Sequence, residues 1–535
     1  MNMAPLRRAD WRFLIPAPPG GRFDHLVLLG GTDALVARLE QVGVARRVSR
    51  RLPSSPSADA VVALRDDRWQ PGAVAKALVS GGVFYGEVDR RRTGTWALTP
   101  GRAGRMLRRA GLVPVALHWA IPEFESCRRL LPLDSDAALV WYFDTLHTAG
   151  SPLALMADIG ARLWGRGRPT RLGMLAPCFG LTAVLPASPS DLPGPLAHPE
   201  LPDAVRQRGT RVALLTSGQD DGSRVVILPF PPGASEPAMV LKLSRMAAFN
   251  GNTEREQATL RELRGRLEPG LRRSVPEPLG SFRHGDLAVG IESVAPGPSM
   301  VVTSGRLGGK LDRAIEDLRA ATDWLARFHQ QAGCGATWSP AVAQRVEEQL
   351  DRYRSLGSDP RMTRLIDLAR RRSRELTGAS LPIVRVHNDF GPWNVHRAGD
   401  LVSVIDWELG EGAAPDRSGP ALCDLIYFIT QWSVRVRHLR GEAGELRGFR
   451  ELWVEPARGG RAADAAWTSL REYMRRLAID PRFLPLLLVH TWSERALERL
   501  ARRESSGPGA PSGRYDGYLL ALAGAAGRLF DGSGS

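Results

Sequence analysis

The chain is poor in cysteine. Its 535 residues include four, at Cys127, Cys178, Cys334 and Cys423. No two of them have the C-x-x-C spacing of a thiolate zinc site, and four scattered cysteines cannot form a dense disulfide framework. This scarcity excludes small disulfide-stapled and zinc-ribbon proteins, and we expect a protein of the reducing cytoplasm.

Long apolar runs are also missing. The N-terminal segment has only a short apolar run before its prolines, and no later segment approaches the ~18 apolar residues of a membrane-spanning helix. The contents of 43% hydrophobic and 24% charged residues are ordinary for globular protein. We therefore expect a non-exported protein without a membrane span, and its length favours two or three domains.

Lysine is scarce, since only Lys76, Lys242 and Lys310 occur among 72 lysines and arginines. The formal net charge of +15 comes from arginines spread along the whole chain, and no nucleic-acid recognition motif accompanies them. We attribute the charge to a bias in composition and expect no dedicated nucleic-acid binding. A protein partner stays unknown from the sequence.

A stretch rich in proline at residues 185–204 predicts a linker, because proline cannot continue a helix or a central strand. Before it, residues 1–184 alternate strand-like apolar runs with helical patterns such as 32–43, which predicts an α/β domain. The apolar runs lie at 26–31, 58–64, 81–88 and 112–120.

After the linker, three strand-like runs lead into a helical pattern at 254–267, and helices then dominate apart from one β-rich island. This order predicts a small β-rich lobe over residues 205–296 and a larger, mostly helical lobe over 297–530, together an α+β region. The three runs lie at 212–216, 223–230 and 238–243.

The island is VRVHNDFGPWNVHRAGDLVSVIDWE, residues 384–408. Asn394 and Asp406 supply the amide and carboxylate oxygens that Mg²⁺ prefers. Asp389 is placed to orient a hydroxyl group and accept its proton, and His387 is expected to brace the loop. Local turn chemistry alone does not require these residue types at this spacing.

The order H-x-D-x-x-x-x-N followed by V-I-D-W-E resembles the catalytic loop and metal-binding segment of the aminoglycoside phosphotransferase and choline kinase-like family. This resemblance implies a two-lobed protein-kinase-like fold that uses ATP or GTP with Mg²⁺. It implies that Asp389 is the catalytic aspartate, that His387 supports the catalytic loop, and that Asn394 and Asp406 bind magnesium.

Two neighbouring positions extend or depart from the family pattern. Asp424, in P-A-L-C-D-L-I-Y-F, resembles an aspartate that holds the catalytic loop in this family. Asn388 stands where glycine is frequent in the family. We expect Asn388 to be tolerated, because asparagine adopts positive φ more readily than most residues.

A lysine within the strand-like run V-L-K-L indicates where nucleotide phosphates bind. In a chain that otherwise uses arginine, Lys242 provides a compact point charge for which the arginine fork is not equivalent. The resemblance implies that Lys242 pairs with a glutamate of the next helix. Glu256 is the better candidate and Glu254 the alternative, because the phase of the helix is not fixed by the sequence.

The nucleotide contacts are predicted on either side of this lysine. The turn TSGQDDGS at residues 216–223 occupies the position of a phosphate-covering loop, with Ser217 and Gly218 as contacts. The segment around Glu292 is predicted to lead into the hinge that meets the base of the nucleotide. His329 lies in an apolar helical pattern and is expected to be a buried helix residue.

The N-terminal runs resemble a Rossmann-like class I methyltransferase sheet. Gly30 and Gly31 are all that is left of its glycine-rich cofactor turn, without the G-x-G pattern or the preceding acidic residue. We therefore expect a shortened, non-catalytic domain that does not use S-adenosylmethionine.

Together these patterns predict a phosphotransferase that moves the γ-phosphate of ATP or GTP to a hydroxyl of a sugar, nucleoside, polyol or aminoglycoside-like molecule. Residues 411–535 carry no surplus of acidic groups, which disfavours a polycationic acceptor. Two alternatives stay open: a nucleotide-binding pseudoenzyme or scaffold, and a bifunctional methyltransferase and kinase.

Overall fold

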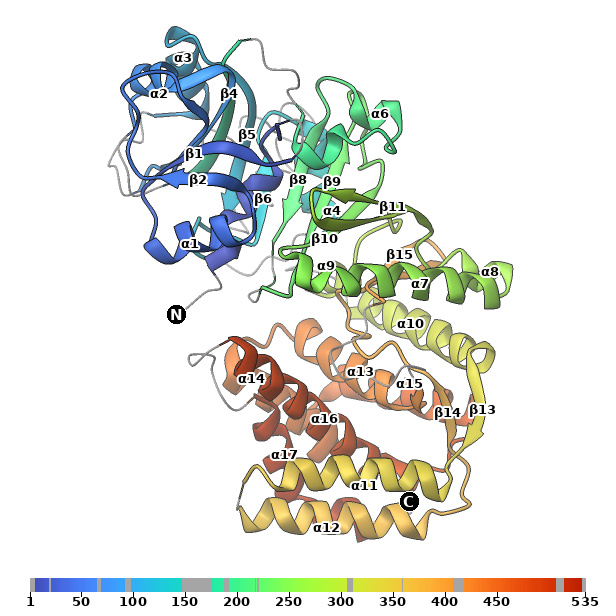
Figure 1. Cartoon of the computed structure of the whole chain (residues 1–535). Coiled ribbons are helices and arrows are strands. Elements are labelled where there is room, and N and C mark those ends of the chain that lie inside the picture. The colour runs from blue at the N-terminus through green and yellow to red at the C-terminus, as the bar shows by residue number, and fades with distance from the viewer. Residues whose placement is uncertain are drawn as a thin grey trace. The chain divides into compact units, whose positions relative to one another are not determined.

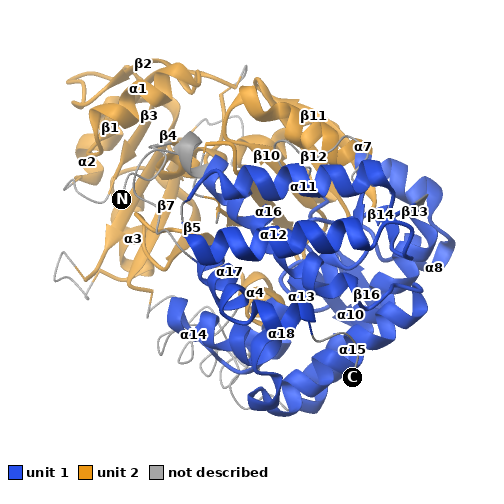
Figure 2. Ribbon diagram, turned by 90° about the horizontal axis from the view of Figure 1, so that it is seen from below, with its two compact units in different colours: residues 1, 259–276, 295–535 blue, residues 2–258, 277–294 orange. Residues whose placement is uncertain are grey.

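The computed structural model of the chain contains two compact units (Figures 1 and 2). One comprises residues 2–258 and 277–294, and the other comprises residues 259–276 and 295–535 together with residue 1. The structure describes residues 5–18, 21–64, 69–91, 98–146, 176–186, 192–216, 218, 221–305, 311–357, 359–407, 418–506 and 514–531.

The unit that holds most of the N-terminal half is built on one 12-stranded sheet, of order β11-β12-β10-β9-β8-β6-β5-β7-β4-β3-β1-β2. The neighbours from β2 through β1 and β3 to β4 are parallel, and the other pairs are antiparallel. The strands are β1 (Phe23–Leu29), β2 (Ala45–Ser49), β3 (Ala58–Ala63), β4 (Leu78–Asp89), β5 (Val113–Ile121), β6 (Arg129–Pro132), β7 (Cys178–Val184), β8 (Arg211–Leu215), β9 (Arg224–Phe230), β10 (Val240–Ser244), β11 (Pro278–His284) and β12 (Leu287–Glu292).

Helices of this unit connect the strands and cover them. Thr32 caps α1 by accepting a hydrogen bond from the Leu35 amide, which satisfies one of the otherwise unpaired amides of the first turn. The helices are η1 (Pro5–Phe13), α1 (Asp33–Gln41), α2 (Pro71–Ala77), α3 (Pro100–Arg109), α4 (Asp136–Thr145), η3 (Gly194–Ala197), α6 (Asp203–Arg206) and η4 (Ala247–Phe249).

The sheet runs without interruption across the predicted linker. Strand β6 pairs with β8, and buried side chains of α4 share a core with β8 and β9. The segment 185–204 contributes Leu192, Leu196 and Leu201 to the core beneath β8, β9 and β10. The domain limits stay a prediction. Within this unit, residues from both sides of the predicted linker share one sheet and common apolar cores.

Most predicted strands of this unit match observed ones. The runs at 26–31, 58–64, 81–88 and 112–120 overlap β1, β3, β4 and β5, and the three runs after the linker overlap β8, β9 and β10. Strand β2 was not predicted, because its sequence ARRVS exposes Arg46 and Arg47 and lacks a buried apolar run. The methyltransferase-like assignment stays a prediction.

The other unit is mostly helical. Its apolar core includes fully buried Trp324, Trp407 and Trp432, and Ser339 and Asp359 cap two of its helices. Its helices are α8 (Pro269–Arg272), α9 (Met300–Gly305), α10 (Leu311–Gln331), α11 (Pro340–Arg354), α12 (Pro360–Glu375), α13 (Cys423–Val436), α14 (Gly441–Phe449), η5 (Arg450–Val454), η6 (Pro456–Arg458), α15 (Gly460–Arg476), α16 (Phe483–Ser506), α17 (Arg514–Gly524) and α18 (Ala526–Asp531).

Short strands in this unit carry the polar island. They are β13 (Gly333–Thr337), β14 (Pro382–Arg385), β15 (Val395–Ala398), β16 (Leu401–Val404) and β17 (Ser418–Pro420). The helix α7 (Asn250–Arg266) contains the division between the two units. Within the described ranges, no helix combines the length and apolar content that a bilayer crossing requires.

Candidate active site

The loop between β14 and β15 is fixed from below by a buried carboxylate. Asp424, in the first turn of α13, accepts hydrogen bonds from the backbone amides of His387 (2.7 Å) and Asn388 (2.9 Å). Asn388 has a φ of 67°, the left-handed conformation expected to be tolerable for asparagine. The two bonds from one carboxylate therefore set the direction in which the chain enters the loop.

His387 connects this loop to the segment that carries Asp406. Its Nε2 lies 2.9 Å from the carbonyl oxygen of Ile405, and its Nδ1 accepts a hydrogen bond from the Asp389 amide at 3.2 Å. Because an N–H must face the carbonyl, the neutral ring carries its proton on Nε2. Both nitrogens of this buried ring thus contact the backbone of the two segments, and the supporting role of His387 stays a prediction.

Asp389 and Asn394 face each other across the loop. The side-chain nitrogen of Asn394, Nδ2, lies 2.9 Å from the backbone oxygen of Asp389 and 3.0 Å from Oδ2 of Asp389. The Trp393 indole donates a hydrogen bond to the same Oδ2 at 3.3 Å. Since the nitrogen of Asn394 is used in these bonds, its side-chain oxygen points away from Asp389. The side-chain oxygen of Asn394 is therefore left as a ligand atom that can bind a cation.

Each of the two site aspartates is followed by a buried aromatic residue. Phe390 and Trp407 are fully buried, and their rings lie 5.7 and 6.4 Å from the ring of Trp324 on α10. Asp406 has a φ of 68°, which turns the chain sharply between its strand and Trp407. One aromatic cluster thus anchors both polar segments, and the residues Asp389 and Asp406 are themselves half-buried.

Burial raises the pKa of Asp389 to about 6; the nearby Arg495 opposes this rise, and the negative charge of Asp406 adds to it. Arg495, on α16, donates to the backbone and side-chain oxygens of Asn388 and also pairs with Glu498 at 2.9 Å. A carboxylate with this pKa is ionised near neutral pH and still basic enough to accept a proton.

Asp424 also has a support on its other side. His329 lies 3.7 Å from it, and the His329 ring bonds to Tyr473, whose hydroxyl donates to the Ala421 backbone. Burial alone would raise the pKa of Asp424, but the two nearby histidines, His329 and His387, and the hydrogen bond from the His387 backbone amide outweigh burial and lower it. His329 is therefore the buried helix residue that the sequence predicted.

We expect Asp424→Asn to lower the free energy of unfolding by about 1–3 kcal/mol, because one of two buried backbone amides loses its acceptor. The catalytic loop should loosen as well, so that kcat falls more than the stability change alone explains. Chemical denaturation and steady-state kinetics measure the two effects. Asp323→Asn, which breaks an exposed ion pair to Arg476, is the matched control and should leave both values near wild type.

In the other unit, Lys242 belongs to a buried quartet of charged residues, together with Arg224, Glu256 and Glu292. The Lys242 amine lies 2.7 Å from Glu256 of α7, the predicted partner, and 3.2 Å from Glu292 at the end of β12. Arg224 of β9 pairs with the second oxygen of Glu256. Glu254, the alternative partner, pairs instead with Arg283 on the surface.

The two carboxylates of the quartet differ in character. The positive charges of Arg224 and Lys242 outweigh the effect of burial and hold the pKa of Glu256 below its ordinary value. Burial, reinforced by the negative charge of Glu256, raises the pKa of Glu292. The Lys242–Glu256 pair is thus the firmly ionic contact, and the side chain of Glu292 turns toward Lys242.

The predicted phosphate-covering turn is described in part. Ser217 lies outside the described residues, whereas Gly218 packs so closely on Ser223 that an added Cβ would collide with that side chain. Gly218 is therefore required at least for packing of the turn. Its predicted contact with phosphate stays a prediction.

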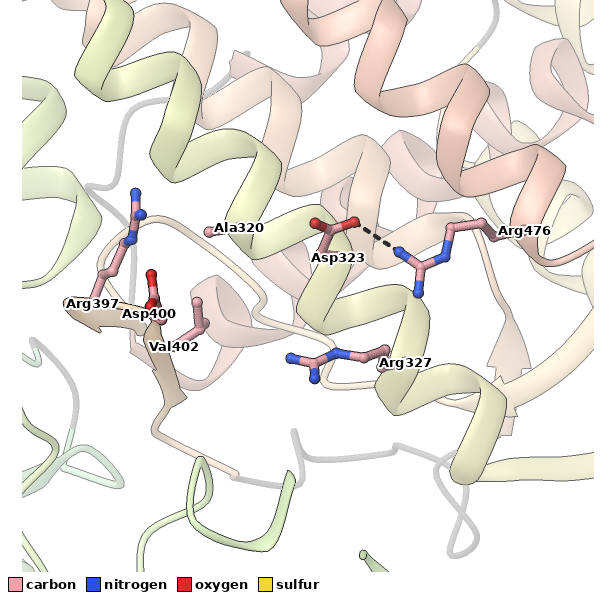
Figure 3. A pocket seen from close by; sticks show the side chains of 7 residues that line it. All are labelled: Ala320, Asp323, Arg327, Arg397, Asp400, Val402 and Arg476. Carbon is pink, nitrogen blue, oxygen red and sulfur yellow. Dashed lines mark hydrogen bonds and ion pairs between the residues drawn. The ribbon is translucent and has the colours of Figure 1, made fainter. Parts of the chain in front are cut away.

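A cavity of about 370 Å³ in the helical unit has a different lining (Figure 3). Arg327, Arg397 and Arg476 contribute to it, and Arg476 is paired with Asp323 at 2.7 Å. Its other lining residues are Ala320, Asp323, Asp400 and Val402. None of the predicted site residues lines this cavity, so we assign it no part in the candidate active site.

The pairing of Lys242 with Glu256 and the Asp389–Asn394 loop both fall within a recognised sequence family. Residues 232–473 match the phosphotransferase enzyme family. The matched region contains Lys242 and Asp424 and the predicted site residues between them. Residues 1–231 lie outside it, and a comparison with curated proteins finds no match to the chain.

Similar solved structures extend over more than half of the chain. A glucosamine kinase in complex with glucosamine, ADP and inorganic phosphate has 19% identity and a TM-score of 0.37, covering 61% of this chain and 82% of its own. A choline kinase from Streptococcus pneumoniae has 13% identity and a TM-score of 0.33, covering 56% and 89%. A spectinomycin phosphotransferase in complex with ADP and spectinomycin has 10% identity and a TM-score of 0.31, covering 56% and 90%.

Several residues around the site were not found from the sequence. One of them is Arg224, which pairs with Glu256, and two others are Arg495 and Glu498, which contact Asn388 in the loop. Arginine is so abundant in this chain that the sequence gives no reason to select one of them. Tyr427 is buried near Asp389, and it lies in the helix from which the sequence analysis named only Asp424. The signal that would have found Tyr427 is its position three residues after Asp424, on the same helix face.

Proposed function

We propose that this protein is a small-molecule kinase that transfers the γ-phosphate of ATP or GTP to a hydroxyl group. The observation that carries the proposal is the loop in which Asp389 faces Asn394, next to Asp406, on a backbone held by Asp424. Phosphoryl transfer needs positioned charges more than covalent chemistry, and this loop supplies a base and oxygen ligands together.

Asn394 and Asp406 would hold magnesium. The donor set fits, because it offers one amide oxygen directed away from Asp389 and one carboxylate, and Mg²⁺ is commonly held by one or two protein oxygens plus water and phosphate. When bound, the ion would neutralise charge on the β- and γ-phosphates.

Lys242, held by Glu256, would bind the triphosphate. Its amine is a point charge whose direction is fixed by two carboxylates, so little side-chain freedom is lost when a phosphate replaces one of them. Asp389 would orient the acceptor hydroxyl and accept its proton. The backbone after Glu292 would meet the nucleotide base.

Our candidate for the acceptor site is a cavity of about 510 Å³ that is lined in part by α16, the helix that also contacts Asn388. On α16, the residues that contact Asn388 are Arg495 and Glu498. Arg499, the next residue after Glu498, lines this cavity together with Tyr353 and Tyr515. The charged residues of its lining are Arg354, Arg499, Arg514, Asp359 and Asp516.

This lining has aromatic rings and no acidic surplus. A polycationic aminoglycoside would need such a surplus for charge complementarity, so the cavity favours a neutral or anionic sugar, nucleoside or polyol. An aminoglycoside-like acceptor stays the alternative within the same reaction class.

For the N-terminal part, we propose a role without methyl transfer. The turn at Gly30 and Gly31 has positive φ angles of 77° and 80°, and Arg50 donates to the Gly31 oxygen while pairing with Asp33 in the first turn of α1. An arginine therefore stands at the turn where a cofactor would need access. Titration of the protein with S-adenosylmethionine at millimolar concentration should show no binding, and binding would revive the bifunctional alternative.

Turnover of ATP and GTP against a panel of sugars, nucleosides, polyols and aminoglycosides tests the function. We expect metal-dependent phosphorylation of one panel class, and Lys242→Met should lower kcat/KM for the nucleotide by about 10²-fold, because a charge that stabilises the transferring phosphate is lost. Lys76→Met, at an exposed lysine of α2, is the matched control. A folded wild-type protein that binds no nucleotide by calorimetry would rule out the kinase, whereas binding without turnover would favour the scaffold.

A further inference from the structure

The turn between β8 and β9, which the sequence predicts to cover the phosphates, is held by a residue near the N-terminus. Asp10 of η1 forms a fully buried ion pair with Arg245, whose Nη2 lies 2.8 Å from Asp10. The same Arg245 guanidinium donates to the Thr216 hydroxyl at 2.8 Å and to the Ser223 backbone oxygen at 3.2 Å. Thr216 and Ser223 are the two ends of the turn, so one ion pair connects both ends to the N-terminal helix.

Asp10 also touches the turn directly. Its carboxylate accepts a hydrogen bond from the Thr216 hydroxyl, and the Thr216 backbone amide donates to the Arg128 carbonyl at 2.8 Å. Arg128 directly precedes β6, the strand that pairs with β8. The first end of the turn is therefore fixed by the N-terminal helix and by the chain that leads into β6.

A second contact reaches the far side of the turn. Arg38, in the last turn of α1, forms an ion pair with Asp221 at 2.7 Å, and the two side chains are 32% and 17% exposed. Asp221 lies two residues before Ser223. Arg245 follows Lys242 by three residues and lies directly after β10. The ion pair with Asp10 therefore contacts the end of the lysine strand as well as the turn, and the ion pair of Arg38 contacts the turn.

We propose that Asp10 and Arg38 are positioning residues for the nucleotide. The N-terminal part holds the contacted residues of the turn in place next to the Lys242 strand, and it thereby sets the affinity of the proposed kinase for ATP or GTP. This inference rests on the proposed function. It follows that a ligand or partner that moves α1 relative to the turn changes nucleotide affinity without touching the catalytic loop.

The test is kinetic, in the full-length protein. Arg38→Ala should raise KM for the nucleotide about fivefold, with kcat, the acceptor KM and the melting temperature close to wild type. Arg38→Lys keeps the charge opposite Asp221 and should restore most of the affinity. The double variant Arg38→Ala/Asp221→Ala should be no worse than either single variant, because both remove the same contact.

Arg46→Ala is the matched control, since it breaks an exposed ion pair to Asp24 elsewhere in the N-terminal part and should leave KM unchanged. Asp10→Asn removes the buried pair and should raise KM further; if it does not fold, the Arg38 series still decides. A wild-type KM in Arg38→Ala, or equal losses in kcat and stability, would overturn the inference. A wild-type protein that binds no nucleotide would instead overturn the proposed function.

Discussion

Asp389→Asn is expected to lower kcat by about 10²- to 10⁴-fold, because the acceptor hydroxyl loses the group that orients it and accepts its proton. Asparagine keeps the shape of the side chain and can still accept the hydrogen bond from Trp393. The Kd for the magnesium nucleotide should therefore change little. Pre-steady-state or steady-state phosphorylation assays, together with calorimetry, measure the two quantities.

The pH dependence gives a second measure of the same residue. Because burial raises the pKa of Asp389 to about 6, the carboxyl is protonated and inactive below that pH and ionised above it. The wild-type kcat should thus rise with pH up to a midpoint near 6 and then level off. A cation bound at Asp406 would shift this midpoint downward by offsetting the negative charge there. The residual activity of Asp389→Asn should lack this limb.

Asp400→Asn is the control for this substitution, because Asp400 is an exposed aspartate in the turn between β15 and β16. It should keep wild-type kcat and the same pH profile. If Asp389→Asn kept kcat within about threefold of wild type, Asp389 would not be the base. A folded Asp389→Asn protein with no nucleotide affinity would place the residue in nucleotide binding instead.

Asp406→Ala is the other substitution with a large expected effect. It removes the carboxylate of the proposed magnesium pair, leaving Asn394 as a single weaker ligand, and we expect a loss of about 10³-fold in kcat together with loss of metal-dependent nucleotide binding. Calorimetry with the nucleotide, in the presence and absence of Mg²⁺, measures the binding. Chelation of the metal from wild-type protein should give the same nucleotide affinity as the variant.

Asp367→Ala, at an exposed aspartate of α12, is the control and should bind the magnesium nucleotide like wild type. Substituting Asp406 also removes a negative charge near Asp389, so the pKa of Asp389 should fall in the variant protein. Equal nucleotide affinity with and without Mg²⁺ in wild type would contradict the metal assignment, whatever the variant does.

The sequence places the four polar residues in one loop region because their pattern is local. His387, Asp389, Asn394 and Asp406 lie within 20 residues, and the apolar strands on both sides fix how they project. Lys242 was found for the opposite reason, since its rarity in this chain made it stand out. Both signals can be read without knowing any long-range contact.

The supporting contacts could not be predicted because they join distant segments. Asp10 and Arg245 are separated by 235 positions, and Arg495 reaches Asn388 over 107. Nothing in the local pattern of a short helix near the N-terminus indicates which of many arginines it will meet. The same limit applies to the pairing of β6 with β8, because a local pattern does not indicate that strands on either side of a proline-rich stretch share one sheet.

The shared sheet has a consequence for how the chain matures. During synthesis β6 leaves the ribosome about 80 residues before β8. The N-terminal strands therefore present an open edge at β6, and β8 adds to this edge when it emerges. A fragment begun near residue 205 would be made with that strand edge bare, and bare edges recruit other chains. The N-terminal strands thus provide the sheet edge on which β8 and the strands beyond it assemble.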